Sequence, residues 1–178
     1  MAFSTRDREA YNNIKYLIMK KLFVILSVTL FMNLGFSQVD GIDIKELLTL
    51  TNSQRATDCK CAGKKQKAVG MLVWNDNLAA AAQEQAEFLI KKKSISHTGA
   101  HGSDPATRAK KHGYSWSYVG ENIAKGQETL EEVIKSWMKS PPHCRNIMNG
   151  NYTEFGAAVV LAKNGQLIWV QVFGHPSE

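Results

Sequence analysis

The chain has 178 residues, of which 44% are hydrophobic and 21% charged, and its formal net charge is +6. This length favours a single domain, and the composition excludes a repetitive or low-complexity protein. The lysine-rich runs at 64–67 and 91–93 are short and lack interleaved aromatic residues, so we interpret them as solvated surface and exclude nucleic acid as a partner.

The N-terminal segment has the pattern of an export signal. Lys20 and Lys21 precede an apolar run over residues 22–32, and the small residues Gly35 and Ser37 mark a cleavage site before residue 38. The run is shorter than the roughly 20 residues that a spanning helix needs, although an uncleaved anchor is the alternative. We therefore predict an exported protein, periplasmic or extracellular, that has no transmembrane segment after cleavage and is a monomer.

This interpretation divides the chain into three parts. Residues 19–37 are the signal peptide, residues 1–18 are a non-native or unstructured extension ahead of a second start methionine, and residues 38–178 form the domain. Removing residues 1–37 takes away five basic and two acidic side chains, which leaves the domain with a modest net charge of +3.

All three cysteines, Cys59, Cys61 and Cys144, lie in the predicted domain. An exported chain meets an oxidising compartment, so we expect one disulfide. Pairing between Cys59 and Cys61 would close a very small, strained ring. We therefore expect Cys144 to pair with Cys59 or with Cys61, and a metal site made by the three thiols is the weaker alternative.

The first half of the domain alternates helices with short connections. Apolar spacing predicts a helix over residues 42–57, followed by a loop over 58–67 and a short apolar segment at 71–74. Asn75 and Asp76 offer N-cap chemistry for a long helix that ends in the lysines at 91–93. Asp104 and Pro105 begin a short helix through Lys111.

The second half adds one strongly amphipathic helix and a hairpin. Thr129 and Glu132 form a capping box for a helix that Pro141 and Pro142 end. Two strands, 155–162 and 167–173, are joined at an Asn-Gly pair and are apolar on both faces. Such strands need cover on both sides, which predicts an α+β fold: a three-layer α-β-α sandwich around a small antiparallel sheet.

Three loop-like segments each place one ionisable side chain beside glycine, proline or serine. They are residues 97–102, 120–124 and 140–143, and the side chains are His97, Glu121 and His143. Two imidazoles and a carboxylate presented by separate loops predict a shared cleft. The bland alternative is that the histidines are structural and that Glu121 is a latch paired inside the fold.

Together these segments resemble the CAP superfamily of cysteine-rich secretory proteins, antigen 5 and pathogenesis-related 1 proteins, and most closely its bacterial SCP-like branch. The resemblance covers nearly all of residues 45–174. The matching segments are Leu72-Val73-Trp74-Asn75 with Leu78-Ala79, His97-Thr98 with Gly102 and Arg108, Gly113-Tyr114, Gly120-Glu121-Asn122-Ile123-Ala124, Trp137 with Ser140-Pro141-Pro142-His143, Tyr152-Thr153-Glu154-Phe155-Gly156, and Trp169-Val170-Gln171-Val172-Phe173-Gly174.

The resemblance implies an α-β-α sandwich, export, and a central cleft in which two histidines and acidic residues hold a divalent metal such as zinc in some members. By motif, the histidines are His97 and His143, and the first acid is Glu121. In eukaryotic members a second acid follows the helix tryptophan by three residues. Ser140 occupies that position here, so the set of four is incomplete.

Three further residues join the predicted cleft. His101 follows His97 by four residues, but the glutamate of H-E-x-x-H is absent and the local glycines disfavour a helix, so we reject a zincin and keep His101 as a rim ligand. Arg108 matches the family arginine and is expected to clamp the His97 loop. Asn122 is expected to shape a turn at the cleft.

These observations predict an exported, non-enzymatic binding module whose cleft takes a lipid-like ligand, a cell-surface polymer or another protein. The alternative is a metal-assisted hydrolase of peptide or envelope material, with His97 and His143 as zinc ligands and Glu121 as an accessory group. No residue is assigned as catalytic. A nucleophile made of Cys144 and His143 is rejected, because adjacent residues on a helix do not face each other.

Overall fold

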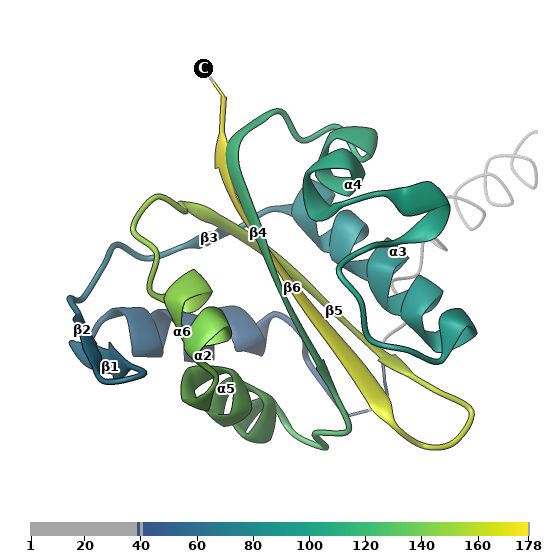
Figure 1. The fold of residues 1–178 in the computed structure, drawn as a ribbon, viewed down its shortest axis with the longest axis horizontal. Helices are drawn as coiled ribbons and strands as arrows, with labels where there is room; N and C mark the ends of the chain where they lie inside the picture. The colour runs from purple at the N-terminus through teal and green to yellow at the C-terminus, as the bar shows by residue number, and fades with distance from the viewer. Residues whose placement is uncertain (1–38, 40, 178) are drawn as a thin grey trace, which may run out of the picture. The chain divides into compact units, whose positions relative to one another are not determined.

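The centre of the fold is a four-stranded sheet with the order β3 (Val73–Trp74), β5 (Glu154–Leu161), β6 (Leu167–Pro176) and β4 (Trp116–Lys125) (Figure 1). The computed structural model describes residues 39 and 41–177. The predicted extension 1–18 and the predicted signal peptide 19–37 lie outside the described residues.

Helices cover both faces of this sheet (Figure 1). One layer contains α2 (Glu46–Arg55), α5 (Leu130–Lys139) and α6 (Pro141–Ile147), and the other contains α3 (Asp76–Lys92) and α4 (Pro105–Lys111). The predicted α-β-α sandwich is therefore confirmed. Within residues 39 and 41–177, no helix combines the length and the hydropathy needed to cross a bilayer.

Three helices begin where the sequence predicts, because a polar side chain satisfies the first free amides of each. Asn75 Oδ1 accepts from the amides of residues 77 and 78 at 2.9 and 3.2 Å. Asp104 Oδ1 accepts from the amide of residue 107 at 2.7 Å, and Thr129 Oγ1 accepts from the amide of residue 132 at 3.1 Å. These capping bonds fix the first residues of α3, α4 and α5.

The sequence predicts an antiparallel sheet, but one of the three strand pairings is parallel. The strand β5 pairs antiparallel with β6, and β6 pairs antiparallel with β4, but β3 and β5 run parallel. A parallel partner needs a long crossover, and here the crossover contains α3, α4, β4, α5 and α6. Local pattern does not reveal such a pairing.

Two short elements replace predicted irregular segments. Residues 58–67, predicted as a loop, contain an antiparallel hairpin of β1 (Cys59–Cys61) and β2 (Lys64–Gln66). A 3-10 turn, η1 (Ala100–Gly102), forms the second half of the segment 97–102, called here the His97 segment. The hairpin lies beside the α2, α5 and α6 layer and positions two of the three cysteines (Figure 1).

The disulfide joins Cys61 to Cys144, so the structure selects one of the two predicted pairings and leaves Cys59 as a thiol. The two Cα atoms are 5.7 Å apart and the residues are 83 positions apart in the chain. The chain-entropy model assigns a loop of this length about 4.5 kcal/mol of stabilisation. The bond therefore ties the β1–β2 hairpin to α6.

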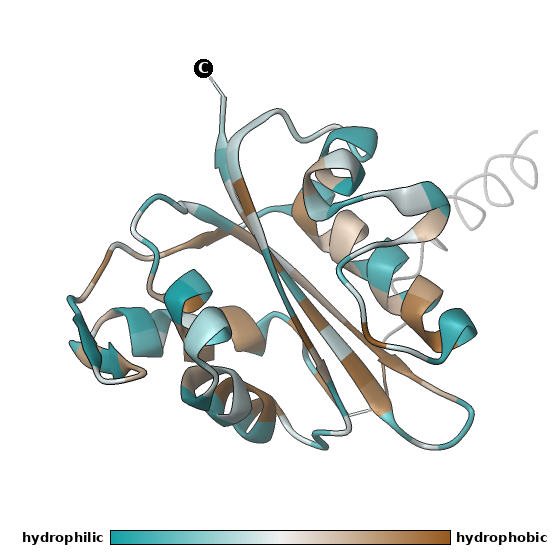
Figure 2. Ribbon diagram, viewed as in Figure 1, coloured by the Kyte–Doolittle hydropathy of each residue, from teal (hydrophilic) through white to brown (hydrophobic). Residues whose placement is uncertain are grey.

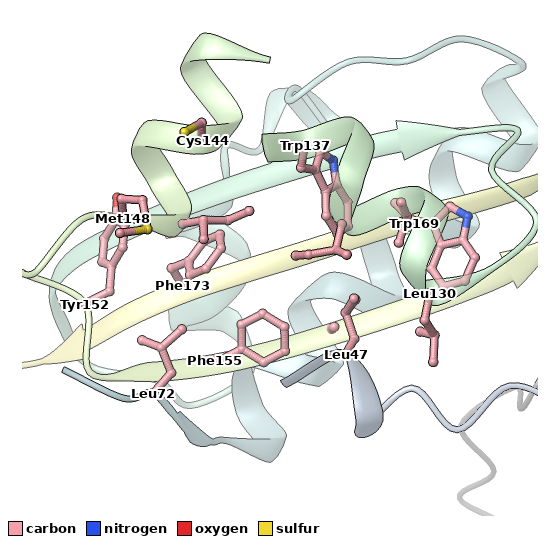
Figure 3. Close-up of a cluster of buried hydrophobic side chains, with 14 of the residues drawn as sticks. Leu47, Leu72, Leu130, Trp137, Cys144, Met148, Tyr152, Phe155, Trp169 and Phe173 are labelled. Carbon is pink, nitrogen blue, oxygen red and sulfur yellow. The ribbon is translucent and has the colours of Figure 1, made fainter. Parts of the chain in front are cut away.

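Alternation along β5 and β6 divides the interior into two cores. Hydrophobic residues recur along the central strands of the sheet (Figure 2). One face of the sheet packs against α2, α5 and α6 through large side chains that include Trp137, Phe155, Trp169 and Phe173 (Figure 3). The other face is lined by smaller side chains against α3 and α4, including those of Ala158 and Val170. Both faces are thus dry, as the apolar strands require.

The second core depends on the absence of a side chain at Gly156. A Cβ atom built there would lie 2.1 Å from the backbone nitrogen of Ala79 in α3, which cannot move away as a flexible side chain could. We expect Gly156→Ala to lower the free energy of unfolding by about 2–3 kcal/mol, because α3 must shift off the sheet. Urea unfolding followed by circular dichroism measures this.

Gly70→Ala is the matched control, because a Cβ atom at Gly70 would have open space around it. We expect that variant to stay within about 0.5 kcal/mol of wild type. Equal unfolding midpoints for the two variants would show that the approach of α3 to β5 at Gly156 is looser than the structure indicates.

Candidate functional site

The site is built around Glu121, whose side chain is only 1% exposed. Its two carboxylate oxygens have different partners. Oε2 accepts from Arg108 Nη2 at 2.6 Å, and Oε1 lies 2.8 Å from His97 Nδ1. A buried carboxylate is costly unless it is paired, and here both oxygens are used.

Arg108 holds the His97 segment in place, as the sequence analysis predicts. Its Nη1 donates to the backbone carbonyls of His97 at 3.2 Å and Ser103 at 2.9 Å, while Nη2 binds Glu121. Gly99 allows this approach, because a Cβ atom there would lie 2.9 Å from Arg108 Nη1 and 2.6 Å from the Gln85 side-chain oxygen. The buried guanidinium therefore connects α4, the loop and β4.

Glu121 and Asn122 lie within β4, so the segment 120–124 is a strand and not the predicted loop. The pairing of β4 with β6 joins Glu121 to Val172 and Asn122 to Gln171. Neighbouring side chains of a strand point to opposite faces. Glu121 accordingly contacts the α3–α4 side of the sheet, and Asn122 contacts α6, so the predicted turn at Asn122 is wrong.

A buried amide network joins β4 to α6 and places His143. Asn122 Nδ2 donates to the His143 carbonyl at 3.2 Å and to Gln171 Oε1 at 3.1 Å. Asn146 Nδ2 donates to the Glu121 carbonyl at 3.0 Å and to Asn122 Oδ1 at 2.9 Å. Gln171 Nε2 reaches Thr51 Oγ1 in α2 at 3.1 Å. The roles of Asn146 and Thr51 were missed in the sequence, because isolated polar residues on helices are ordinary there.

His143 lies on a helix and not on the predicted loop. Pro141 and Pro142 end α5 but also occupy the first turn of α6, where the missing amide of proline costs nothing. His143 follows them and is half-buried. The helix α6, which carries His143, lies on the opposite face of the sheet from α4, whose Arg108 holds the His97 segment (Figure 1).

The two imidazoles have pKa values shifted in opposite directions. The hydrogen bond to Glu121 raises the pKa of His97 above 6.5, against the opposing effects of burial and of Arg108. Burial lowers the pKa of His143, and the charge of His97 lowers it further. In the interval between the two pKa values, His97 is protonated while His143 is neutral.

We predict that NMR titration of the histidine side chains will show His97 titrating above 6.5 and His143 below it. His97 then stabilises the fold fully below the pKa of an unfolded histidine, about 6.5, and loses this contribution as the pH rises through its folded pKa. His143 has the opposite effect: its contribution is present above about 6.5 and is lost as the pH falls through its folded pKa.

Two variants check the assigned causes. Glu121→Gln should lower the pKa of His97, because the main group that stabilises its proton is gone. His97→Ala should raise the pKa of His143. An unchanged His143 titration in the second variant would contradict the electrostatic coupling of the two rings.

His101 is not brought to this cluster by any contact in the described part of the chain. It is exposed in η1 and adopts a left-handed backbone conformation with φ of 54°. Its role as a rim ligand stays a prediction. The fold brings five of the predicted site residues around β4: His97, Arg108, Glu121, Asn122 and His143.

Metal-binding geometry is incomplete at the two histidines. Among residues 39 and 41–177, one group of three potential metal-ligating side chains is close enough to share an ion. It consists of Cys59, Cys61 and Cys144, whose sulfur atoms lie within 4.8 Å of one another. Two of these sulfurs form the disulfide. His97 and His143 therefore offer at most two imidazole ligands, and Glu121 acts on His97 as a hydrogen-bond partner.

Comparison with known proteins agrees with the fold and the motifs. Residues 48–173 match the model of the cysteine-rich secretory protein family, CAP. The chain is 33% identical over 129 residues to the uncharacterized protein YkwD of Bacillus subtilis, a match that covers 72% of this chain and 46% of that protein. The chain thus spans about half the length of this relative.

Solved structures show the same architecture. An outer surface protein from Borrelia burgdorferi has a TM-score of 0.61 and 28% identity, over 76% of this chain and 97% of that one. An extracellular protein containing an SCP domain from Bacillus anthracis also has a TM-score of 0.61, with 19% identity over 74% of this chain and 39% of that one. With its α-β-α sandwich and the family match over residues 48–173, this chain belongs to the cysteine-rich secretory protein (CAP) family and is of the bacterial SCP type.

Proposed function

We propose that this protein is an exported, non-enzymatic binding module whose ligand contacts His97 and His143. The observation that carries this proposal is the state of Glu121. Glu121, the acid hydrogen-bonded to His97, is 1% exposed, and Arg108 and His97 occupy its two oxygens. A general base must reach the proton that it abstracts, and Glu121 is held away from solvent.

The histidines remain available to a ligand. The His97 side chain is 58% exposed, and its Nδ1 faces Glu121, so Nε2 is the nitrogen left for a partner. The neutral His143 adds a second donor or acceptor near neutral pH. Such a pair suits the hydroxyl, phosphate or carboxylate groups of an envelope polymer better than a purely apolar ligand, and we propose a cell-surface polymer as the ligand class.

Export is supported by the relatives. The structures named above are described as an outer surface protein and as an extracellular protein. The proposed signal peptide at residues 19–37 would take the chain out of the cytoplasm, and the disulfide suits an oxidising compartment.

A direct test uses soluble peptidoglycan fragments as the probe and records the imidazole NMR signals of the purified chain. We expect the signals of His97 and His143 to shift on titration while that of His112 stays in place, because the His112 ring is paired with Glu84 and not with a residue of the proposed site. His97→Ala should weaken binding at least tenfold. Binding of equal affinity by this variant would overturn the assigned site.

The metal-assisted hydrolase is the second candidate, and one arrangement favours it. A carboxylate that orients a histidine through Nδ1 is the usual outer partner of a metal-bound imidazole. A structure of NaASP2 with Zn²⁺ shares the fold at 17% identity and a TM-score of 0.54. Catalytic zinc normally has three protein ligands, whereas His97 and His143 supply two here.

Calorimetric titration with zinc chloride separates the two candidates. The binding module predicts no more than weak binding that is lost in His97→Ala and in His143→Ala and kept in His101→Ala. Release of soluble fragments from insoluble peptidoglycan provides the second measurement. Zinc-dependent release by the wild-type chain, absent in His143→Ala, would replace the binding module with the hydrolase.

A further inference from the structure

A group of three sulfur atoms lies where β1 meets α6, and one of its members, Cys144, directly follows His143 in that helix. The Sγ atoms of Cys59, Cys61 and Cys144 are all within 4.8 Å of one another. Cys61 and Cys144 form the disulfide and are 1% and 0% exposed, whereas Cys59 is a partly exposed thiol. The proposed ligand site uses none of these residues.

Strand geometry explains why Cys59 and Cys61 compete for one partner. Alternate residues of a strand point to the same face, and the exposed Lys60 between the two cysteines points away. Cys59 pairs with Gln66 and Cys61 with Lys64 across the hairpin, so β2 fixes both positions. The hairpin therefore holds a thiol beside a disulfide that it could replace.

We propose that this cluster is a thiol–disulfide exchange centre in which Cys144 alternates between Cys61 and Cys59. The Cys59 thiolate attacks Sγ of Cys144, the Cys59–Cys144 bond forms, and the Cys61–Cys144 bond breaks with its electron pair leaving on Cys61. One proton is lost from Cys59 and one is taken up by Cys61. The step needs no external oxidant or reductant, because the number of disulfides is unchanged.

The two pairings cost nearly the same chain entropy. Cys61 and Cys144 are 83 positions apart, and moving the bond to Cys59 lengthens the closed loop by only two residues. Loop-closure entropy varies with the logarithm of loop length, so it does not favour either bond. The balance is set by local packing of β1 against α6.

The surroundings of Cys59 make the exchange slow at neutral pH and faster in alkali. Burial and the neighbouring Asp58 raise the pKa of the Cys59 thiol. Asp58 is itself held by Lys67 at 3.1 Å and Lys65 at 3.6 Å, and it accepts from the amide of Ala68 at 2.9 Å. Because the thiolate is the attacking species, the rate should rise with pH.

The experiment traps free thiols in the wild-type chain. Protein purified without reductant is held at about pH 8.5, near the ordinary pKa of a cysteine thiol, then blocked with N-ethylmaleimide and digested with trypsin. Cleavage after Arg55, Lys60 and Lys64 puts Cys59 and Cys61 on separate peptides. We expect the label first on Cys59 and then, with incubation, on Cys61 as well. Label confined to Cys59 at all times, or label on Cys144, would overturn the proposal.

Two variants give an independent measurement. Cys61→Ser leaves Cys59 and Cys144, and we expect a new disulfide, seen as a mass two hydrogens below that of the reduced chain and as loss of all maleimide labelling. Cys59→Ser is the control that keeps the Cys61–Cys144 bond. A Cys61→Ser variant with wild-type circular dichroism and two reactive thiols would contradict the exchange. If this variant does not fold, the wild-type trapping decides the question.

Discussion

Glu121→Gln should lower the free energy of unfolding by about 3–5 kcal/mol, because it leaves a buried arginine without its counter-charge. Arg108 and Glu121 are each 1% exposed and are joined at 2.6 Å. The amide of glutamine would also present a donor group where the carboxylate now accepts from both Arg108 and His97. Urea unfolding monitored by circular dichroism measures the loss.

Glu84→Gln is the matched control for this variant. Glu84 likewise contacts one base and one histidine, Lys111 at 2.8 Å and His112 at 2.7 Å, but its side chain is 21% exposed and that of Lys111 is 64% exposed. Solvent-accessible pairs contribute about 1 kcal/mol or less. Equal losses in Glu121→Gln and Glu84→Gln would mean that burial does not strengthen the Arg108–Glu121 pair.

A double variant tests whether the loss in Glu121→Gln comes from the unpaired charge of Arg108 and not from lost side-chain packing. Arg108→Met with Glu121→Leu removes both charges together, and we expect it to recover most of the stability lost in Glu121→Gln. It should also release the His97 segment, because methionine cannot bind the carbonyls of His97 and Ser103. Loss of activity or binding in Glu121→Gln is therefore to be interpreted only alongside its stability.

Arg55→Met should lower the free energy of unfolding by about 4 kcal/mol, which is the second large effect that the structure predicts. Arg55 is fully buried in α2 and has no acidic partner among the described residues. Its guanidinium donates to four backbone carbonyls: Gly70 at 2.7 Å, Ile147 at 2.6 Å, Asn149 at 2.9 Å and Tyr152 at 3.1 Å. The estimate takes roughly 1 kcal/mol for each acceptor left without a donor.

The position of Arg55 explains how a buried charge is tolerated without an acid. The Ile147 carbonyl lies in the last turn of α6, where helix carbonyls have no helical partner and carry partial negative charge, and the carbonyls of Asn149 and Tyr152 lie in the segment that follows the helix. Burial nevertheless lowers the pKa of Arg55 to about 10. Arg55 therefore closes the C-terminal end of the helix that carries both His143 and Cys144.

Thermal unfolding of Arg55→Met, Arg55→Lys and Arg145→Met provides the comparison. Arg145 is exposed on α6, so its substitution should change stability by less than about 0.5 kcal/mol. Lysine at 55 should recover less than half of the loss, since one ammonium group cannot reach carbonyls spread around a planar fork. A lysine variant as stable as wild type would contradict the proposed role of the fork.

Sequence alone determined the elements whose causes lie within a few residues. The caps at Asn75, Asp104 and Thr129 begin their helices as predicted, because each side chain satisfies amides two or three positions away. The apolar strands also required a helical layer on each face. The contact of Arg108 with the His97 segment was predicted from the resemblance to the family motif, because the residues near Arg108 in the sequence do not indicate it.

Only the tertiary structure decided the rest, because the deciding contacts join residues far apart in the chain. Cys59 and Cys61 are chemically alike and share one strand face, so the packing of β1 on α6 selects Cys61. The segment around Glu121 is a strand because β6 pairs with it, and its carboxylate is closed because Arg108 and His97 approach from other elements. The free energy of such long-range pairs is absent from any short window of sequence, and it is these pairs that bury Glu121 and occupy both of its carboxylate oxygens.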